Sequence, residues 1–289
     1  MEKEQDLKRV FIVGTARSGT TLLQSMLGSH PEIYTLPETH FLDRAMYKEP
    51  WKRLFQIVGP RGKNNVERFL QALESSQPER DKRPLSVNLP SHTFRKKSWA
   101  REAFRLVDEL CLREEKRVWV EKTPLNLRFL GLIRGVFRDA RVIHMIRNPL
   151  DNIASLYEAS QKHPDVFAQS TLQKCVRRWV KEYLISLWYL GRRGHFFVVY
   201  EDLVEHPEVL LRQVCLFLGV GFHEEMLVFE GAARQVVTQE EKWKANNFGS
   251  LKKSNQKKFR VFTQKQRDYL ERRVGRYSTA PFSTLVERG

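Results

Sequence analysis

A glycine loop that contains one arginine follows the first apolar run of the sequence. Residues 10–13 run into Gly14, and Gly19 then precedes a stretch with helical spacing. Backbone N–H groups at a helix start have no intrahelical partner, and the helix dipole adds positive potential there. The pattern therefore predicts an anion site, to which five consecutive residues would contribute: Arg17, Ser18, Gly19, Thr20 and Thr21.

The spacing of the two glycines matches the phosphate loop of nucleotide hydrolases, but Thr20 stands where that loop has a lysine. The sequence also lacks a clear acidic strand end that would hold magnesium, since the run 141–146 ends in Arg147. We therefore expect an anion bound without a metal ion, with Arg17 as the cation. The alternative is a tight strand-to-helix turn that binds nothing.

A second candidate anion site follows the run 141–146. Arg147 ends that run, and Pro149 suits the first turn of a helix. At the C-terminal edge of a parallel sheet, where α/β proteins bind ligands, Arg147 and Ser155 could share one phosphate if the helix runs alongside. The alternative is a strand-end arginine paired with Asp151. Two separate anion sites suit a nucleotide with two anionic ends.

Four short apolar runs are typical of strands buried on both faces, namely 10–13, 118–120, 141–146 and 196–200. Helical spacing lies between them, as in 207–219, which begins with Pro207 and ends with Gly219. Alternating strands and helices predict right-handed crossovers and a parallel sheet. The fold class that we expect is α/β, a three-layer P-loop-like fold with a central parallel sheet and helical insertions.

Two segments depart from this alternation. Residues 63–101 are rich in charge, Pro and Ser with weak periodicity, which predicts a helical insertion plus loop that forms part of a lid or acceptor wall. Residues 242–260 are irregular and basic. We expect a single domain over 1–289, with a nucleotide-binding core at about 8–62 and 115–275 and an insertion or acceptor-side region at about 63–114.

The composition bounds the function classes. The 289 residues include 50 Lys and Arg against 34 Asp and Glu, and the net charge of +16 attracts anions. With 41% hydrophobic and 29% charged residues, a disordered chain is excluded. No apolar run is long enough to span a bilayer, and the first residues lack the apolar stretch of a signal peptide. Three scattered cysteines, Cys111, Cys175 and Cys215, favour a reducing, cytoplasmic location over a disulfide scaffold.

These motifs together resemble the sulfotransferases that use 3'-phosphoadenosine 5'-phosphosulfate. Residues 17–23 resemble the family's 5'-phosphosulfate loop, and 147–155 resemble its 3'-phosphate motif. Residues 199–203 resemble a stretch whose tyrosine lies near the adenosine, and 255–260 resemble a late loop that closes over the nucleotide, with Lys-Phe in place of Lys-Trp. The resemblance implies this donor as co-substrate, adenosine 3',5'-bisphosphate as by-product, and no metal.

Within the family, the sequence is most similar to tyrosylprotein sulfotransferases and bacterial relatives. Three stretches carry this likeness: 30–32, 37–39 and 121–124. The cytosolic phenol and steroid branch has lysine where Arg17 stands. Tyrosylprotein enzymes carry a membrane anchor and disulfides, and neither pattern appears in this sequence. We therefore expect the hydroxyl of a carbohydrate, lipid or other small alcohol as acceptor rather than protein tyrosine, and no nucleic-acid partner.

In-line sulfuryl transfer needs a positioned donor, a neutralised leaving phosphate and a deprotonated acceptor. Glu38 lies just past the apolar run 33–36, where a second strand would end on the same sheet edge, and is the candidate base. The resemblance implies the same role. The alternative is a carboxylate near the start of a helix from Thr39, and His40 and His92 are rival bases.

The other roles follow from position and from the resemblance. Arg17 would hold the bridging and sulfuryl oxygens, and Lys122, directly after the strand 118–120, would stabilise developing charge. The alternative for Lys122 is a surface ion pair with Glu121. Three residues would hold the 3'-phosphate, namely Arg147, Ser155 and Lys258. Tyr200 would pack near the adenine, or else serve as a core aromatic at a strand end.

Two other function classes compete with this reading. A magnesium-dependent, kinase-like nucleotide enzyme would use the same glycine loop, but the loop lysine is missing. The net charge also permits a non-enzymatic module that binds nucleic acid or another polyanion. No zinc-finger spacing, RNA-binding aromatic signature or single basic helix supports that module.

Overall fold

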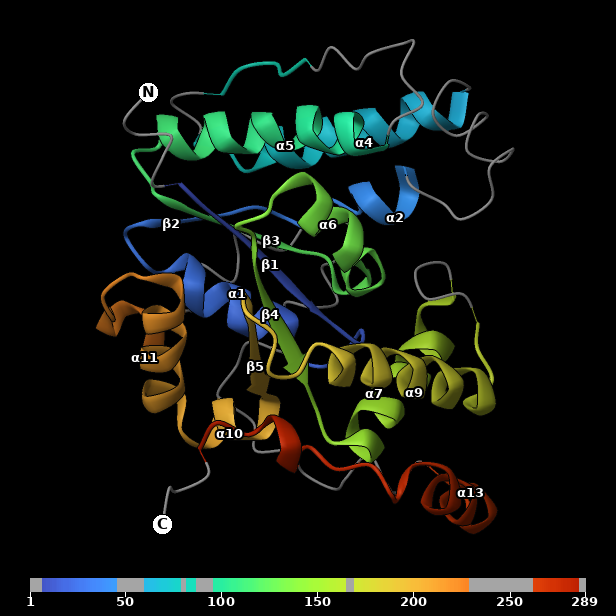
Figure 1. The fold of residues 1–289 in the computed structure, drawn as a ribbon. Coiled ribbons are helices and arrows are strands. Elements are labelled where there is room, and N and C mark those ends of the chain that lie inside the picture. The colour runs from blue at the N-terminus through green and yellow to red at the C-terminus, as the bar shows by residue number, and fades with distance from the viewer. Residues whose placement is uncertain are drawn as a thin grey trace.

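The computed structural model describes six stretches of the chain: 7–45, 60–78, 82–86, 96–164, 169–228 and 262–285. These residues form a three-layer α/β fold around one parallel sheet, as the alternating pattern predicted (Figure 1). The sheet has five strands in the order β2-β3-β1-β4-β5. Their bounds are Lys8–Gly14 for β1, Ile33–Thr35 for β2, Val118–Lys122 for β3, Arg141–Ile146 for β4 and His195–Val199 for β5.

The strands form where β-branched and aromatic residues run continuously, because both faces of the sheet are covered. Residues Val10, Phe11, Ile12 and Val13 of the central strand are completely buried. β1 pairs in parallel with β3 on one side and with β4 on the other. The carboxyl ends of β1, β3 and β4 therefore meet along one edge of the sheet, which is the edge where the glycine loop begins.

Helices cover both faces of the sheet (Figure 1). One face packs under α4, α5, α6, α7 and α9, and the other under α1 and α11. The main helices are α1 Thr20–Gly28, α2 Phe41–Ala45, α4 Pro60–Ser75, α5 Lys96–Arg113, α6 Leu130–Val136, α7 Pro149–Lys162, α9 Leu172–Trp188, α10 Tyr200–Glu205, α11 Pro207–Leu218 and α13 Gln264–Val274. Short 3-10 turns are η3 Pro124–Phe129, η4 Glu224–Leu227 and η7 Ala280–Phe282.

The alternation of side chains along β1 divides the core between the two layers. Phe11 packs at 5.2 Å, centroid to centroid, on Trp119 of β3, and the Phe104 ring of α5 stacks on Trp119 at 5.7 Å. Val10 and Ile12 point to the opposite layer, where they meet α1 and α11. Helix α5 is thus part of the hydrophobic core, although its first residues, 96–101, lie in the stretch with weak periodicity.

The ends of two elements differ from those predicted. The strand expected at 196–200 begins one residue earlier and ends at Val199, and Tyr200 instead opens helix α10. The apolar run 33–36 forms a strand of only three residues, Ile33–Thr35. In both cases the chain leaves the sheet at its carboxyl edge. These exits place the residues that follow, including Tyr200 and Glu38, around the glycine loop.

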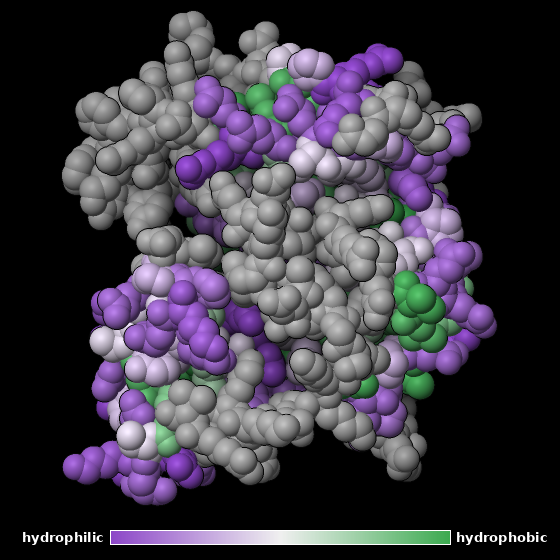
Figure 2. Space-filling view, turned by 180° about the vertical axis from the view of Figure 1, so that it is seen from behind, coloured by the Kyte–Doolittle hydropathy of each residue, from purple (hydrophilic) through white to green (hydrophobic). Residues whose placement is uncertain are grey.

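The surface of the described residues is mainly hydrophilic when seen from behind, with hydrophobic groups in small separate patches (Figure 2). None of the helices in the described ranges is long and apolar enough to cross a membrane. The basic segment 242–260 lies outside the described residues. The role of residues 63–101 as part of a lid or acceptor wall stays a prediction.

Candidate active site

The loop between β1 and α1 is held in a conformation that depends on its glycines. Gly19 has a φ of 98°, and a Cβ built there would lie 2.4 Å from Cδ2 of Tyr200. At Gly14 a Cβ would lie 2.5 Å from the carbonyl oxygen of Met145. Arg17 itself adopts a left-handed φ of 73°. Such backbone strain persists only where the surroundings hold it, and it is typical of ligand-binding turns.

Arg17 points to helix α7. Its Nε donates a hydrogen bond of 3.2 Å to Oγ of Ser155, which is buried. Burial, followed by the positive charge of Arg147, lowers the pKa of Arg17 to about 10, so the guanidinium stays protonated at neutral pH. The sequence predicted Ser155 beside Arg147, and in the structure Ser155 accepts a hydrogen bond from Arg17.

Arg147 joins the second site to the first. Its Nη1 donates a 3.0 Å hydrogen bond to the carbonyl oxygen of Arg17, and its guanidinium lies 4.3 Å from the centroid of the Tyr200 ring. The Nε of Arg147 and Oγ of Ser18 are buried without a hydrogen-bond partner. Buried polar groups are normally satisfied, so these two point to a missing polar ligand at this junction. Tyr200, at the surface of the loop, supports both Gly19 and Arg147.

Two residues that the sequence reasoning missed lock the loop and α7 together. Asn152 donates from Nδ2 to the carbonyl oxygen of Ala16 at 3.2 Å. Glu201 accepts the backbone N–H of Asn148 at 3.1 Å, while the Asn148 side chain caps α7 by accepting the N–H of Leu150. Burial raises the pKa of Glu201. Asparagine is a common N-cap residue, so Asn148 at the start of the expected helix is the sequence signal that could have indicated this junction.

The start of α1 contributes backbone N–H groups, because its N-cap residue Gly19 offers no side-chain hydrogen bond. Thr20 is buried in the first turn. The carbonyl oxygen of Thr21 accepts a 2.9 Å hydrogen bond from the Ser25 hydroxyl. Farther along α1, Nε2 of Gln24 donates to the carbonyl oxygen of Leu36 at 2.6 Å. This bond ties the helix of the glycine loop to the segment that carries Glu38.

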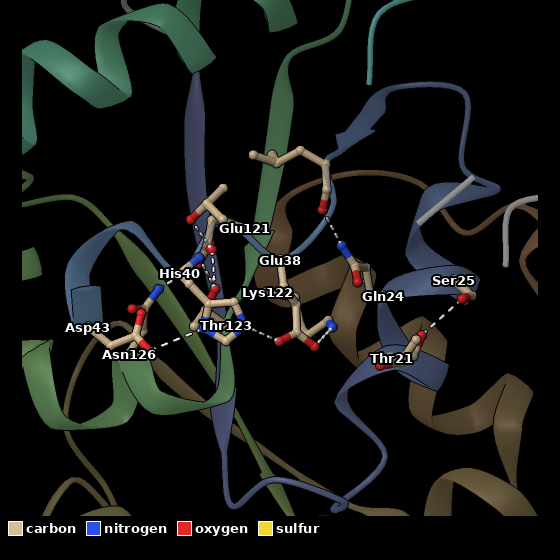
Figure 3. A network of polar contacts seen from close by, with 12 residues as sticks. Thr21, Gln24, Ser25, Glu38, His40, Asp43, Glu121, Lys122, Thr123 and Asn126 are labelled. Carbon is tan, nitrogen blue, oxygen red and sulfur yellow. Dashed lines mark hydrogen bonds and ion pairs between the residues drawn. The ribbon is translucent and has the colours of Figure 1, made fainter. Parts of the chain in front are cut away.

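Glu38 lies between two cations (Figure 3). Its Oε1 forms an ion pair with Nζ of Lys122, and its Oε2 lies 3.1 Å from Nε2 of His40. The Lys122 side chain is completely buried. The surface ion pair between Lys122 and Glu121 that we considered is wrong, because consecutive strand residues point to opposite faces. The carboxylate is thus held between a lysine and an imidazole.

His40 bridges two carboxylates. Its Nδ1 lies 3.1 Å from Oδ2 of Asp43, on the side of the ring opposite to Glu38. Burial alone would lower the pKa of His40, but the hydrogen bonds with Asp43 and Glu38 outweigh that effect and raise the pKa to about 9. The imidazole is therefore protonated at neutral pH. This charge makes His40 a partner of Glu38 and argues against His40 as the rival base.

Glu121 anchors the chain on the far side of β3. Its carboxylate is completely buried and accepts three side-chain hydrogen bonds, at 2.8 Å from Thr39, 2.5 Å from Thr123 and 2.6 Å from Asn126 (Figure 3). Burial raises the pKa of Glu121. Because Thr39 follows Glu38 and Thr123 follows Lys122, this network holds the two segments that present the ion pair.

The glycine loop and the Glu38 cluster share one electrostatic environment. The negative charge of Glu38 is among the charges that raise the pKa of Arg17 against the effect of burial. The structure thus brings together Arg17, Ser155, Arg147 and Tyr200, with Glu38 and Lys122 beside them. Two residues named from the sequence, Lys258 and His92, lie outside the described residues. No cluster of His, Cys, Asp or Glu suited to a metal ion occurs among the described residues.

Comparison with known proteins gives the family context. The sulfotransferase family profile matches residues 9–224. An uncharacterized protein of Aquifex aeolicus is 28% identical over 238 residues, covering 79% of this chain and 28% of that protein. Protein-tyrosine sulfotransferase A of Caenorhabditis elegans is 23% identical over 234 residues, covering 76% of this chain and 52% of that enzyme. This chain therefore matches at most about half the length of these two relatives.

Solved structures share the fold. The sulfotransferase domain of the Synechococcus olefin synthase has a TM-score of 0.56 at 20% identity, covering 94% of this chain and 95% of that domain. A sulfotransferase domain from the curacin biosynthetic pathway has a TM-score of 0.59 at 17% identity, covering 92% of this chain and 97% of that domain. Identities this low show a common architecture only.

Proposed function

Because the chain belongs to the sulfotransferase family, we propose that it moves a sulfuryl group from 3'-phosphoadenosine 5'-phosphosulfate to a hydroxyl acceptor. The observation that carries the choice of donor is the 3.0 Å hydrogen bond from Arg147 to the carbonyl oxygen of Arg17, which joins the two predicted anion sites. A nucleotide with a charged group at each end of one ribose needs two adjacent cationic sites of this kind.

The residues present fit this donor. The glycine loop offers the N-terminal N–H groups of α1 and the Arg17 guanidinium to the 5'-phosphosulfate. Arg147 and Ser155 are assigned to the 3'-phosphate, and the Tyr200 ring to the adenine side. The unpartnered Nε of Arg147 and hydroxyl of Ser18 are donors that an anion would satisfy. Lys258 belongs to this set through the family resemblance alone.

The transfer forms one bond and breaks one bond at sulfur. The acceptor oxygen attacks the sulfuryl sulfur while the bond from sulfur to the 5'-phosphate oxygen breaks, and the by-product is adenosine 3',5'-bisphosphate. Glu38 takes the proton of the acceptor hydroxyl as general base. Arg17 and Lys122 neutralise charge on the leaving phosphate and on the sulfuryl oxygens, as cations held in place by Ser155 and Glu38. No metal ion takes part in this scheme.

His40 serves this scheme as a positioning residue. It holds Oε2 of Glu38 at 3.1 Å and is itself held by Asp43, so the carboxylate has a fixed orientation. The acceptor that we propose is a carbohydrate, a lipid or another small alcohol rather than protein tyrosine. The three cysteines are all free and buried, which supports a reducing, cytoplasmic location as part of the proposal.

The direct test is transfer of labelled sulfate from the donor to a panel of alcohols, phenols and glycans, with and without a chelator. We expect transfer to at least one hydroxyl class, unchanged by the chelator. The proposal fails if no acceptor is labelled and the bisphosphate does not bind. It also fails if the chain binds adenosine triphosphate only with magnesium, which is the behaviour of the kinase-like alternative.

The role of Glu38 is tested by Glu38→Gln, which keeps the shape of the side chain and removes its charge. We expect turnover to fall by about 100-fold or more, since general base catalysis contributes about that much. Affinity for the bisphosphate should stay within about threefold of the unaltered protein. The matched control is Glu32→Gln, at a half-exposed carboxylate paired with Arg117. Normal turnover of Glu38→Gln would remove Glu38 from the mechanism.

A further inference from the structure

An open groove lies on the outer side of α9, between this helix, the 3-10 turn η3 and the end of α13. It has a volume of about 1100 Å³ and is separate from the glycine loop and the Glu38 cluster. Helices α7, α9 and α13 lie together at the lower right of Figure 1. We call this feature the α9–α13 groove. None of the residues assigned above to donor binding or catalysis lines it.

The floor of the groove is an apolar stripe on α9. Val176, Val180, Leu184 and Trp188 recur at intervals of four residues and therefore lie along one face of the helix. At 1.5 Å per residue this stripe is about 18 Å long. Along this stripe the exposure rises from Val176, which is 3% exposed and packs in the core, to Leu184 at 47% and Trp188 at 68%.

The walls of the groove are basic. Six cations line it, and among the described residues no Asp or Glu does: Arg128, Arg177, Lys181, Arg272, Arg273 and Arg276. All six are exposed. Arg128 also donates to the buried carboxylate of Glu182 at 2.6 Å, which fixes that wall against α9. An apolar floor between basic walls selects an occupant with an apolar centre and acidic edges.

We propose that the α9–α13 groove binds an acidic amphipathic helix of a partner protein. The stripe presents anchors at the four-residue spacing that a docked helix uses, and the groove accommodates about three helical turns. Each acidic edge of such a helix would face cations, from η3 and α9 on one side and from α13 on the other. The proposal does not depend on the sulfuryl donor or acceptor.

Charge disfavours two other occupants. A second copy of this chain carries the same net charge of +16, so its surface would be repelled by the basic walls. The chain's own residues 229–261 include eight Lys and Arg against three Glu, which is also the wrong sign. An anionic bilayer has the right sign, and the vesicle measurement in the test below separates it from a peptide.

The test uses a labelled 18-residue helical peptide, with leucine every fourth residue on one face and glutamate along both edges. We expect fluorescence anisotropy to give a micromolar dissociation constant for the full chain, and at least fivefold weaker binding to Leu184→Ala and to Arg273→Ala. Matched controls are Leu216→Ala, at an 82% exposed leucine on α11, and Arg212→Ala on the same helix. A peptide with lysine in place of glutamate should not bind.

Three results would overturn the proposal. The first is peptide binding that the groove variants leave unchanged, or lower no more than the controls do. The second is binding of vesicles of phosphatidylglycerol and phosphatidylcholine that the groove variants abolish, without peptide binding. The third is a dimer in solution that Leu184→Ala dissociates. Bisphosphate affinity, measured for every variant, should stay unchanged, which separates failure of this proposal from failure of the proposed enzyme function.

Discussion

At the scale of single residues, the Glu38 carboxylate is held by two cations, and the chain next to it is fixed by Thr39. Lys122 forms an ion pair with it, His40 holds its other oxygen, and Thr39 next to it is tied to Glu121. A general base must be held close to the proton that it takes, because proton transfer requires a heavy-atom distance of about 3 Å. The cluster supplies that fixed position before any substrate arrives.

The charge on His40 gives a test of this clamp. His40 has a raised pKa of about 9, so its contribution to stability is complete below its unfolded pKa and is lost as the pH rises through 9. Replacing Asp43 by Asn removes one of the two carboxylates that raise this pKa. We expect the His40 titration, followed by NMR of labelled imidazoles, to move to lower pH in Asp43→Asn.

The matched control for this titration is Asp139→Asn, which removes a carboxylate that is 66% exposed and pairs with Arg9. This control should leave the titration of His40 where it is. Identical midpoints in Asp43→Asn and the unaltered protein would show that Asp43 does not hold the charge on His40. Glu38 would then be the carboxylate that holds the charge on His40.

Sequence alone could name Glu38 and Lys122, but it could not reveal how they are held. Strand alternation predicts that Glu121 and Lys122 point apart, yet only the fold places Thr39 on the buried side, beside Glu121. Asp43 stands three residues after His40, a spacing that also fits an ordinary helix start. These contacts join segments about 80 residues apart, and no local pattern encodes them.

At the scale of elements, the glycine loop and α7 behave as one unit. Arg147 and Asn152 both donate to carbonyl oxygens of the loop, at 3.0 and 3.2 Å. The Tyr200 ring at the start of α10 closes the unit from outside. The loop, α7 and α10 each begin at the carboxyl end of a strand, so the parallel sheet itself brings them together.

Gly19→Ala tests this unit. The added Cβ would lie 2.4 Å from the Tyr200 ring, at a φ that side chains rarely adopt. We expect a loss of about 1–3 kcal/mol in the free energy of unfolding. Bisphosphate affinity should fall at least tenfold, because Tyr200 must move away from Arg147. Thermal unfolding and titration calorimetry measure the two effects.

The control for this variant is Gly131→Ala in α6, where an added Cβ meets nothing within 4 Å. It should leave bisphosphate affinity unchanged and raise stability slightly, since Ala favours a helix by about 1 kcal/mol. Equal affinities in Gly19→Ala and Gly131→Ala would contradict the account of the loop.

A histidine pair, in which His144 is buried and His195 is half-buried, joins β4 to β5 and predicts acid sensitivity. Nε2 of His144 lies 2.9 Å from Nδ1 of His195. Burial lowers the pKa of both residues, to about 4 for His195 and well below its ordinary value for His144. The unfolded chain therefore binds more protons than the folded chain between pH 6.5 and 4, and stability falls as the pH falls through that range.

His195→Gln removes one of these groups. Between pH 7 and pH 5, its free energy of unfolding should fall less than that of the unaltered protein, by about 1 kcal/mol. Urea unfolding at both pH values measures the difference. His206→Gln, at an exposed position, is the control and should follow the unaltered protein. If the free energy of unfolding falls equally in all three proteins between pH 7 and pH 5, the histidine pair is not the cause of the acid sensitivity.

Element order was readable from the sequence because parallel strands give apolar runs and crossover helices give a different period. The strand 141–146 was predicted to the residue. The bounds of helix α5 were not predicted, because its composition is polar on average. Its core contacts, such as Phe104 on Trp119, come from one narrow face of the helix. The end of β5 was misplaced because Tyr200 suits a strand as well as the first turn of α10.

At the scale of the whole molecule, the sheet edge collects charge of both signs in one place. The chain carries +16 overall, so its field attracts a donor and a by-product that are strongly anionic. Long-range attraction does not distinguish one anion from another, whereas the junction of Arg17 and Arg147 does. The central claim is that one nucleotide occupies both anion sites at once.

Titration calorimetry without magnesium tests this claim most directly, by comparing adenosine 3',5'-bisphosphate with adenosine 5'-phosphate. We expect the bisphosphate to bind at least tenfold more tightly, since one charge-assisted contact contributes about 1.5–3 kcal/mol. In Arg147→Ala this difference should shrink below about threefold. Equal affinity for the two nucleotides in the unaltered protein, or an advantage of the bisphosphate that survives Arg147→Ala, would contradict the account.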